Sequence, residues 1–285
     1  MVMSEATAFR MESVTPNVFT NTKLRGCNPS YVVTSDGVVV IDTPQLPTRA
    51  VAMRAEAESH GPIRYLVNTE HHVDHIFGNY FFKGAGTVVF TGDLTLHVGD
   101  HTFHCLWTPG HTPGQLAVHV PEERVVFTGD TIFSGCQTWL MTSDVDQWLA
   151  ALERIRMLDV DRICPGHGPV VPKSYLDVQR AHLMDWKTAV ADAIARGWSR
   201  EETIARVDFR DAFGPVDIGQ GYMLDYIQNL NAASLYDKLQ KTIVPLFYGN
   251  RNGFVDVMLH SIALNGSFFN THLMLQQYVM NAYFL

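Results

Sequence analysis

Asn68-Thr69-Glu70-His71-His72-Val73-Asp74-His75 is the stretch on which the interpretation of this chain depends. It places three histidines and two carboxylates within six residues, directly after an apolar run, Ile63 to Val67. Such a density of imidazole and carboxylate groups is costly to place near a core unless something binds it. Imidazole nitrogen and carboxylate oxygen are common ligands of metal ions. The stretch therefore predicts one part of a metal site, which later residues have to complete.

Three later segments each place a His or an Asp in a Gly/Pro-rich turn after an apolar strand. They are Thr108-Pro109-Gly110-His111-Thr112-Pro113-Gly114, Phe127-Thr128-Gly129-Asp130-Thr131 and Pro165-Gly166-His167-Gly168. Loops at strand ends are where a rigid scaffold presents ligands, and their glycines let the backbone turn sharply. Any one of these segments would be a weak signal, but together with the opening stretch they strongly indicate a metal site.

The first part of the chain alternates between expected strands and helices. Strands are expected at 31–34, 38–41, 63–69, 87–91, 101–107, 115–120, 125–128 and 162–164, and helices at 47–59, 76–82 and 146–158. Further helices are expected at 173–196, from the capping box at 199–202, and at 223–241. Strands and helices that alternate and are then followed by helices place the fold in the α/β or α+β class, and we expect α+β.

With these four segments in place, the sequence resembles the metallo-β-lactamase superfamily, the fold shared by lactamases, glyoxalase II-type thioesterases and lactonases. The resemblance covers roughly residues 14–171. It implies a four-layered αβ/βα sandwich with a dinuclear metal site at one edge and, here, a helical C-terminal extension. On the family's His-x-His-x-Asp-His motif, Glu70 falls at the first His and His72 at the second, Asp74 at the Asp and His75 at the last His.

The resemblance also implies how seven ligands divide between two ions. The first ion would take Glu70, His72 and His111, the second would take Asp74, His75 and His167, and Asp130 would lie between them. Asp74 would in addition accept or deliver a proton, which makes it the expected catalytic residue. No binding residues for an organic cofactor are expected.

Two features depart from the family pattern. Glu70 replaces a histidine, and only 35 residues lie between His75 and His111, a shorter gap than the family leads us to expect. Two divalent ions carry +4, and Glu70, Asp74 and Asp130 would supply −3, whereas a histidine at position 70 would leave −2. Zinc is the metal that the family implies, but an oxygen ligand favours harder ions such as manganese or iron. Diiron members of the family carry a Glu at the second His, so their activity is not transferred here.

His71 has two interpretations. In an extended segment the side chains alternate, so that Glu70 and His72 point one way and His71 the other. This pattern favours a position for His71 outside the set of metal ligands. A local bulge would instead bring His71 to the metal in place of Glu70.

The leading functional hypothesis is metal-assisted hydrolysis of a small molecule. Two ions would hold a bridging hydroxide and polarise a carbonyl ester, thioester, lactone or lactam. The chain contains no Gly-x-Ser-x-Gly segment, the signature of one class of serine hydrolases. Glu70 motivates an alternative, an oxygen-dependent oxidoreductase with a diiron or mononuclear iron centre. The apolar tail from Thr242 onward motivates a third, a binding or assembly protein that keeps a structural metal.

Other residues are weaker candidates. Cys136 follows Asp130 by six residues but is expected to be structural, since no basic neighbour in sequence would lower its thiol pKa. Arg25 and Asn28 are expected in a solvated loop. His101 and His104 are expected to be ordinary strand residues on opposite faces.

Length and composition set the remaining expectations. The 285 residues carry a net charge of −8 without a dense Lys/Arg block, which disfavours nucleic acid and anionic membranes as partners. Neither an apolar signal segment nor a run of membrane-spanning length is present, so a cytoplasmic protein is expected. We expect a metal-site core at 1–172, a helical part at 173–241 packed on it, and an apolar extension at 242–285 that serves as a lid or as a homo-oligomer contact.

Overall fold

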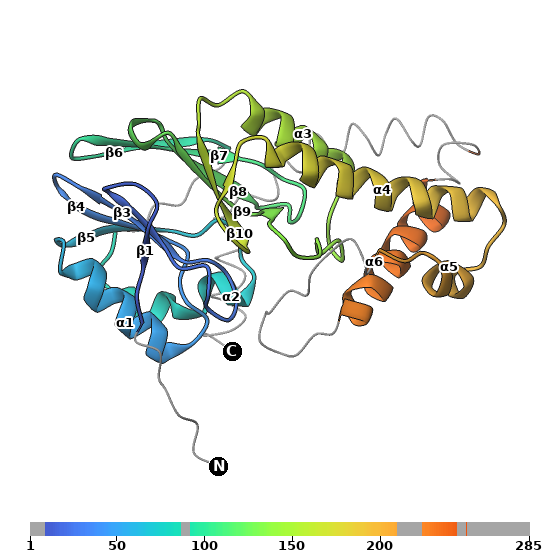
Figure 1. Ribbon diagram of the computed structural model, residues 1–285, viewed down its shortest axis with the longest axis horizontal. Helices are drawn as coiled ribbons and strands as arrows, with labels where there is room; N and C mark the ends of the chain where they lie inside the picture. Colours follow the sequence, from blue (N-terminus) through green and yellow to red (C-terminus); the bar gives the residue numbers. More distant parts are fainter. Residues whose placement is uncertain (1–8, 87–91, 210–223, 244–248, 250–285) are drawn as a thin grey trace, which may run out of the picture.

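Two β-sheets face each other, and helices cover both outer faces (Figure 1). The computed structural model describes residues 9–86, 92–209, 224–243 and 249. The expected α+β sandwich is confirmed within these residues. The predicted strand at 87–91 and the tail at 250–285 lie outside them. Among the described helices, none has the length and apolar character that a membrane crossing needs.

The first sheet pairs five strands in the order β1-β2-β3-β4-β5. They are β1 (Glu12–Ser13), β2 (Val18–Thr20), β3 (Ser30–Thr34), β4 (Gly37–Ile41) and β5 (Ile63–Val67). β3 and β4 form the predicted antiparallel hairpin, whose turn needs a positive φ of 115° at Gly37. Helix α1 (Pro47–Glu58), with Pro47 in its first turn, crosses over so that β5 pairs parallel to β4.

Strand β4 shows how one apolar run contributes to two layers. Val38 and Val40 pack with Met53 on the side covered by α1. Val39 and Ile41 belong to the cluster between the two sheets. Because side chains alternate along a strand, a continuous apolar run is expected where both faces are covered. Each such valine or isoleucine contributes about 1.5–3 kcal/mol when fully buried.

The second sheet pairs six strands in the order β11-β10-β9-β8-β7-β6. They are β6 (Leu94–Val98), β7 (His101–Trp107), β8 (Leu116–Val120), β9 (Val125–Phe133), β10 (Arg162–His167) and β11 (Val171–Pro172), with a short 3₁₀ turn, η2 (Pro121–Glu123), between β8 and β9. β10 lies parallel to β9, and the other pairs are antiparallel.

Helices α3 (Val145–Arg156) and α4 (Tyr175–Ala195) cover the outer face of the second sheet, whereas α5 (Arg200–Arg206) and α6 (Leu224–Lys238) pack against α4 (Figure 1). A π-helical turn, η4 (Leu239–Ile243), follows α6. Trp148 of α3 and Trp186 of α4 are fully buried in one cluster with residues of β9 and β10. The predicted capping box is confirmed at α5, where Ser199 and Glu202 satisfy each other's backbone N–H groups.

The structure corrects four boundaries near the predicted site, the first being the end of β5, which lies at Val67 and not at Thr69. A helical turn, α2 (Val73–Ile76), begins three residues before the predicted helix and continues into a 3₁₀ segment, η1 (Phe77–Phe82). β9 and β10 also run further than predicted, so that Asp130 and His167 lie in strands rather than in turns. Gly129 at a φ of 47°, and register shifts between β9 and β10 on either side of Pro165, distort these strands without ending them.

Candidate metal centre

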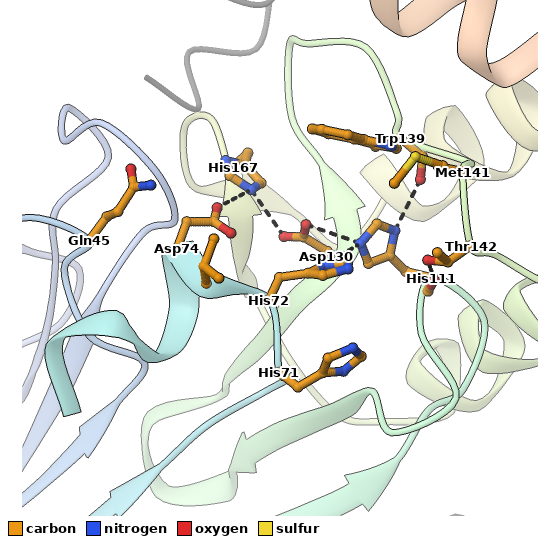
Figure 2. A pocket seen from close by; sticks show the side chains of 11 residues that line it. Gln45, His71, His72, Asp74, His111, Asp130, Trp139, Met141, Thr142 and His167 are labelled. Atoms are coloured by element: carbon orange, nitrogen blue, oxygen red, sulfur yellow. Dashed lines mark hydrogen bonds and ion pairs between the residues drawn. The ribbon is translucent and has the colours of Figure 1, made fainter. Parts of the chain in front are cut away.

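All seven residues that were predicted as ligands come together at one edge of the sandwich. The first four come from the connection after β5 and from α2. His111 follows β7, Asp130 lies in β9, and His167 ends β10. Their side chains form two adjoining groups, which are Glu70, His72, His111 and Asp130 on one side and Asp74, His75 and His167 on the other. Figure 2 shows Asp130 between His111 and His167.

The first group surrounds the Nε2 atom of His111. His72 Nδ1 lies 3.3 Å from this atom, and Asp130 Oδ2 lies 3.4 Å from it. Glu70 contributes both carboxylate oxygens, with Oε1 3.7 Å from His111 Nε2 and Oε2 2.7 Å from His72 Nδ1. The Glu70 side chain is fully buried.

The second group is held against the first by Asp130. Its Oδ1 atom lies 3.2 Å from His75 Nε2 and 3.3 Å from His167 Nε2. Asp74 Oδ2 lies 3.4 Å from His167 Nε2 and 3.9 Å from His75 Nε2. Glu70 Oε1 also approaches this group, at 3.4 Å from His75 Nε2. Asp130 therefore has one oxygen toward each group.

These separations fit ligands of divalent ions. Two ligand atoms bound at about 2.1 Å to one tetrahedral ion lie about 3.4 Å apart. Most of the distances above, between 3.2 and 3.4 Å, have this value. Glu70 Oε1, His75 Nε2 and Asp130 Oδ1 are buried and make no hydrogen bond. Since buried polar atoms are normally satisfied, the donor set fits two cations.

The outer ring nitrogens of two histidines are fixed by hydrogen bonds. His75 Nδ1 donates to Asp42 Oδ2 at 2.9 Å, and His111 Nδ1 donates to the carbonyl oxygen of Trp139 at 3.0 Å. Asp42 adopts a left-handed φ of 54° and also accepts the N–H and hydroxyl of Thr69, at 2.8 and 2.6 Å. Such contacts select the tautomer that leaves Nε2 free to bind a metal.

The electrostatics of the site couple its carboxylates to its imidazoles. Burial opposes ionisation of Asp130, but the neighbouring His167 and His75 hold its pKa well below the usual range. Burial likewise opposes a charge on His167, but Asp130 and Asp74 raise its pKa. Burial lowers the pKa of His111, which favours the neutral imidazole. Asp130 and His111 therefore favour the states that metal ligands require, whereas His167 would release a proton on binding a metal.

The backbone around His167 leaves room for these side chains. A Cβ atom on residue 166 would lie 2.0 Å from Asp130 Oδ1, so only a glycine lets the carboxylate lie there. Asn28 crosses from the first sheet, and its side-chain amide donates to the carbonyl oxygens of Pro165 and Gly168 at 3.0 and 2.7 Å. The expectation of a solvated loop was therefore wrong for Asn28, whereas Arg25 is exposed.

A cavity of about 370 Å³ opens beside the two groups. It is lined by Gln45, His71, His72, Val73, Asp74, His111, Asp130, Trp139, Met141, Thr142 and His167. His71 belongs to neither group of ligands, and its ring lies 5.0 Å from that of His72. Figure 2 shows its side chain directed away from Asp74 and Asp130. Glu70 therefore belongs to a candidate ligand group, and His71 lies at the cavity wall.

Sequence reasoning missed two residues behind the site. Asp42 directly follows the apolar strand β4. The segment that contains His111 was selected because it follows an apolar strand, so the same sequence signal was available for Asp42. Cys27 forms a further group with Asp42 and His75, all three buried. This group uses the Nδ1 side of His75, which already donates to Asp42. Burial raises the pKa of the Cys27 thiol well above its usual value, so it is a protonated, structural thiol.

Comparison with known sequences gives one family. The profile described as "Metallo-beta-lactamase superfamily" matches residues 22–90 and 86–167. The "Beta-lactamase-like protein 2 homolog" of Caenorhabditis elegans is 29% identical over 182 residues, which are 55% of this chain and 60% of that protein. The "Hydroxyacylglutathione hydrolase" of Maricaulis maris is 29% identical over 153 residues, 47% of this chain and 58% of that protein. The chain thus spans about 60% of the length of these relatives.

Solved structures show the same fold. A "Metallo-beta-lactamase from Pontibacter korlensis" superposes with a TM-score of 0.54 at 19% identity, covering 61% of this chain and 98% of that one. A "stereoselective inverting sec-alkylsulfatase" from Pseudomonas sp. superposes with a TM-score of 0.62 at 14% identity, covering 80% of this chain and 50% of that one. At these identities the likeness concerns the fold alone.

Proposed function

The chain belongs to the metallo-β-lactamase superfamily, and from that premise we propose that it is a dinuclear metal-dependent hydrolase of a small carbonyl compound. The observation that carries this proposal is the convergence of four imidazoles and three carboxylates into two groups that share Asp130. When bound, two divalent ions would supply Lewis-acid activation of the carbonyl and of the attacking water. A cavity of about 370 Å³ beside them has the size of a small-molecule site.

The side chains around the cavity have distinct roles in this proposal. Asp130 holds the two ligand groups at a fixed separation, with one oxygen toward each. Asp74 is the carboxylate on the cavity wall that is partly exposed, at 13% of its side chain, so it can reach both a water and a substrate. It would take a proton from the water and deliver it to the leaving group.

Three observations bear on the identity of the substrate and of the metal. Relatives named hydroxyacylglutathione hydrolases make thioesters the first substrate class to test, beside esters, lactones and lactams. Zinc is the metal implied by the family, and the oxygen ligands of Glu70 increase the relative preference for manganese or iron. Within each of the two groups, the side-chain atoms that would hold an ion lie within 4.8 Å of one another.

The proposal is tested by elemental analysis and by turnover. Protein isolated from its native host should carry two divalent ions per chain and hydrolyse at least one class in a panel of thioesters, esters, lactones and lactams. Protein that holds two ions and turns over none of these classes would refute it.

The position of Glu70 can be tested separately from activity. Glu70→Ala should lose one of two bound ions, because both of its oxygens face ligand histidines. His71→Ala should keep both ions, since His71 lies outside the ligand groups. Loss of an ion only in His71→Ala, measured by elemental analysis, would show that His71 and not Glu70 is the ligand.

A second candidate function is an oxygen-dependent iron oxidoreductase on the same fold. The observation that favours it is again Glu70, whose carboxylate lies between His72, at 2.7 Å, and His75, at 3.4 Å. A second carboxylate between the two groups makes the site richer in oxygen ligands, which favours iron. Native protein handled without oxygen should then contain iron and change its visible spectrum on exposure to air. Zinc without a visible band would eliminate this candidate.

A further inference from the structure

The cavity beside the ligand groups has no cationic side chain among its described lining residues, which include neither lysine nor arginine. Its charged groups are Asp74 and Asp130. The two ions that the proposed function requires would offset these carboxylates and the buried Glu70, and they would face the reacting carbonyl. Carboxylates elsewhere on a substrate would find no lysine or arginine among the described lining residues, and a charge buried without a partner weakens binding. The described cavity is therefore better suited to an uncharged substrate.

The rest of the lining includes a substantial apolar surface. Val73, Trp139 and Met141 line the cavity together with the site histidines. Val73 is 60% exposed and Met141 is 42% exposed, although both are large apolar residues. Trp139 and Met141 lie above His111 in Figure 2. Because its carbonyl oxygen holds His111 Nδ1, the backbone of Trp139 is fixed relative to the site.

This apolar surface continues outward along α2 and η1. Phe77 is 59% exposed and Tyr80 is 66% exposed, four and seven residues after Val73. Residues three and four apart lie on one side of a helical segment, so these rings extend the surface that Val73 begins. Lys83 places its amine 3.7 Å from the centre of the Tyr80 ring at the far end. Exposed apolar surface that is continuous with a cavity indicates a binding site.

We propose that the substrate is an uncharged ester or thioester with an apolar acyl chain, whose carbonyl lies at the ligand groups and whose chain packs on Val73 and extends toward Phe77. This inference rests on the proposed hydrolytic function and adds the substrate class. In the reaction, the C–S or C–O bond of the ester breaks and the water oxygen bonds to the acyl carbon. One water proton passes through Asp74 to the leaving group, and the other leaves with the carboxylic acid product.

The acyl preference is measured with thioesters that differ in one property at a time. Acetyl, butanoyl, hexanoyl and octanoyl thioesters of N-acetylcysteamine vary only the chain, and glutathione thioesters of the same acids add two carboxylates. For the metal-loaded protein, kcat/KM should rise about threefold for each methylene that reaches the Val73 surface. It should be at least tenfold lower for each glutathione thioester than for its neutral counterpart.

Variants at two exposed valines separate the acyl surface from general effects. Val73→Lys should lower the octanoyl-to-acetyl ratio of kcat/KM about tenfold, and Val73→Leu should keep it. Val51 of α1 is 52% exposed and does not line the cavity, so Val51→Lys is the matched control and should behave as the unchanged protein. The ratio is used because differences in metal loading between preparations cancel in it.

Two results would overturn the substrate class while leaving hydrolysis intact. One is a glutathione thioester turned over as fast as its neutral counterpart, and the other is a rate independent of acyl length. If no member of the thioester, ester, lactone and lactam panel is hydrolysed, the proposed function fails, and calorimetry with octanamide decides the acyl site by itself. Binding that Val73→Lys weakens and Val51→Lys does not would support the acyl site, and absence of binding would refute it.

Discussion

Two clusters of imidazole and carboxylate in this molecule have similar composition and opposite chemistry. At the second one, which shares no residue with the ligand groups, His101 lies between Asp100, 2.8 Å from Nδ1, and Glu123, 2.9 Å from Nε2. Both ring nitrogens therefore have a partner. At the metal centre, in contrast, His75 Nε2 and Asp130 Oδ1 are buried without a hydrogen bond. Buried polar atoms that converge without hydrogen bonds indicate a site for a cation, and a high density of imidazole and carboxylate groups alone does not.

The cluster around His101 has a structural explanation. Asp100 also accepts the backbone N–H of Ser35 at 2.8 Å, and Glu123 also accepts the amide of Asn17 at 2.8 Å. Ser35 and Asn17 belong to the first sheet's connections, whereas His101 begins β7 of the second sheet. The cluster therefore links the two sheets, and the expectation that His101 is a strand residue and not a ligand agrees with its contacts.

Among the variants that compare the two clusters, the one that removes the carboxylate of Asp130 should have the largest effect. Asp130→Asn should lower hydrolysis about 10³-fold and release bound metal, because each of its oxygens faces one ligand group. His101→Asn should keep the metal content and the rate. Elemental analysis and turnover of both variants check this. Equal metal loss in the two variants would contradict a difference in metal binding between the two clusters.

Changing the support behind His75 should have a smaller effect. Asp42→Asn keeps the shape but weakens the hydrogen bond to His75 Nδ1, which should lower metal affinity about 10–100-fold. Asp100→Asn makes the same change at His101 and should leave affinity unchanged. Competition with a chromogenic chelator gives both affinities. An Asp42→Asn affinity equal to that of the unchanged protein would show that Asp42 does not orient a ligand.

The smallest effect is expected in the pH dependence of stability. Burial opposes a charge on His101, but hydrogen bonds to Glu123 and Asp100 raise its pKa in the folded protein. The resulting stabilisation is fully present below the ordinary pKa of histidine and is lost as the pH rises through the raised value. His101→Gln should therefore cost about 1–2 kcal/mol at low pH and less at high pH. Urea unfolding of both proteins at low and at high pH measures this loss of stability. A loss in unfolding free energy that grows with pH would contradict the prediction.

The individual strands and helices could be predicted because their local patterns are strong, whereas the layered sandwich was implied by the resemblance to the metallo-β-lactamase superfamily. The continuous β-branched run of Val38 to Ile41 and the helical spacing around Trp148 are local patterns that tertiary contacts reinforce. The residues that gather at the site could also be selected, since each belongs to a short segment at or near the end of an apolar strand. What could not be predicted is which segments continue as strands. Asp130 and His167 remain in β9 and β10 because bulges at Gly129 and Pro165 accommodate the irregular residues.

Contacts between residues that are far apart in the sequence could not be predicted either. The segment around Asn28 has the polar composition of a solvated loop. The side-chain amide of Asn28 has hydrogen-bond acceptors only because the carbonyl groups of Pro165 and Gly168, far away in the sequence, lie beside it. The same applies to the Trp139 carbonyl, because a backbone acceptor leaves no trace in residue type. Cys136 agrees with the sequence expectation, since burial raises its thiol pKa to about 12.

The proposed ligands come from both halves of the sandwich, so metal binding at this site would be coupled to folding. The segment after β5 supplies four of them, and β7, β9 and β10 supply the others, which are up to 97 residues further along the chain (His167 counted from Glu70). A cation bound by both halves stabilises only the docked state, by about 2.7 kcal/mol when its free concentration is 100 times its dissociation constant. Chelation should thus lower the melting temperature and speed hydrogen exchange at the facing ends of both sheets. The metal would act as a reversible cross-link between the sheets, formed late in folding because loops that long must close first.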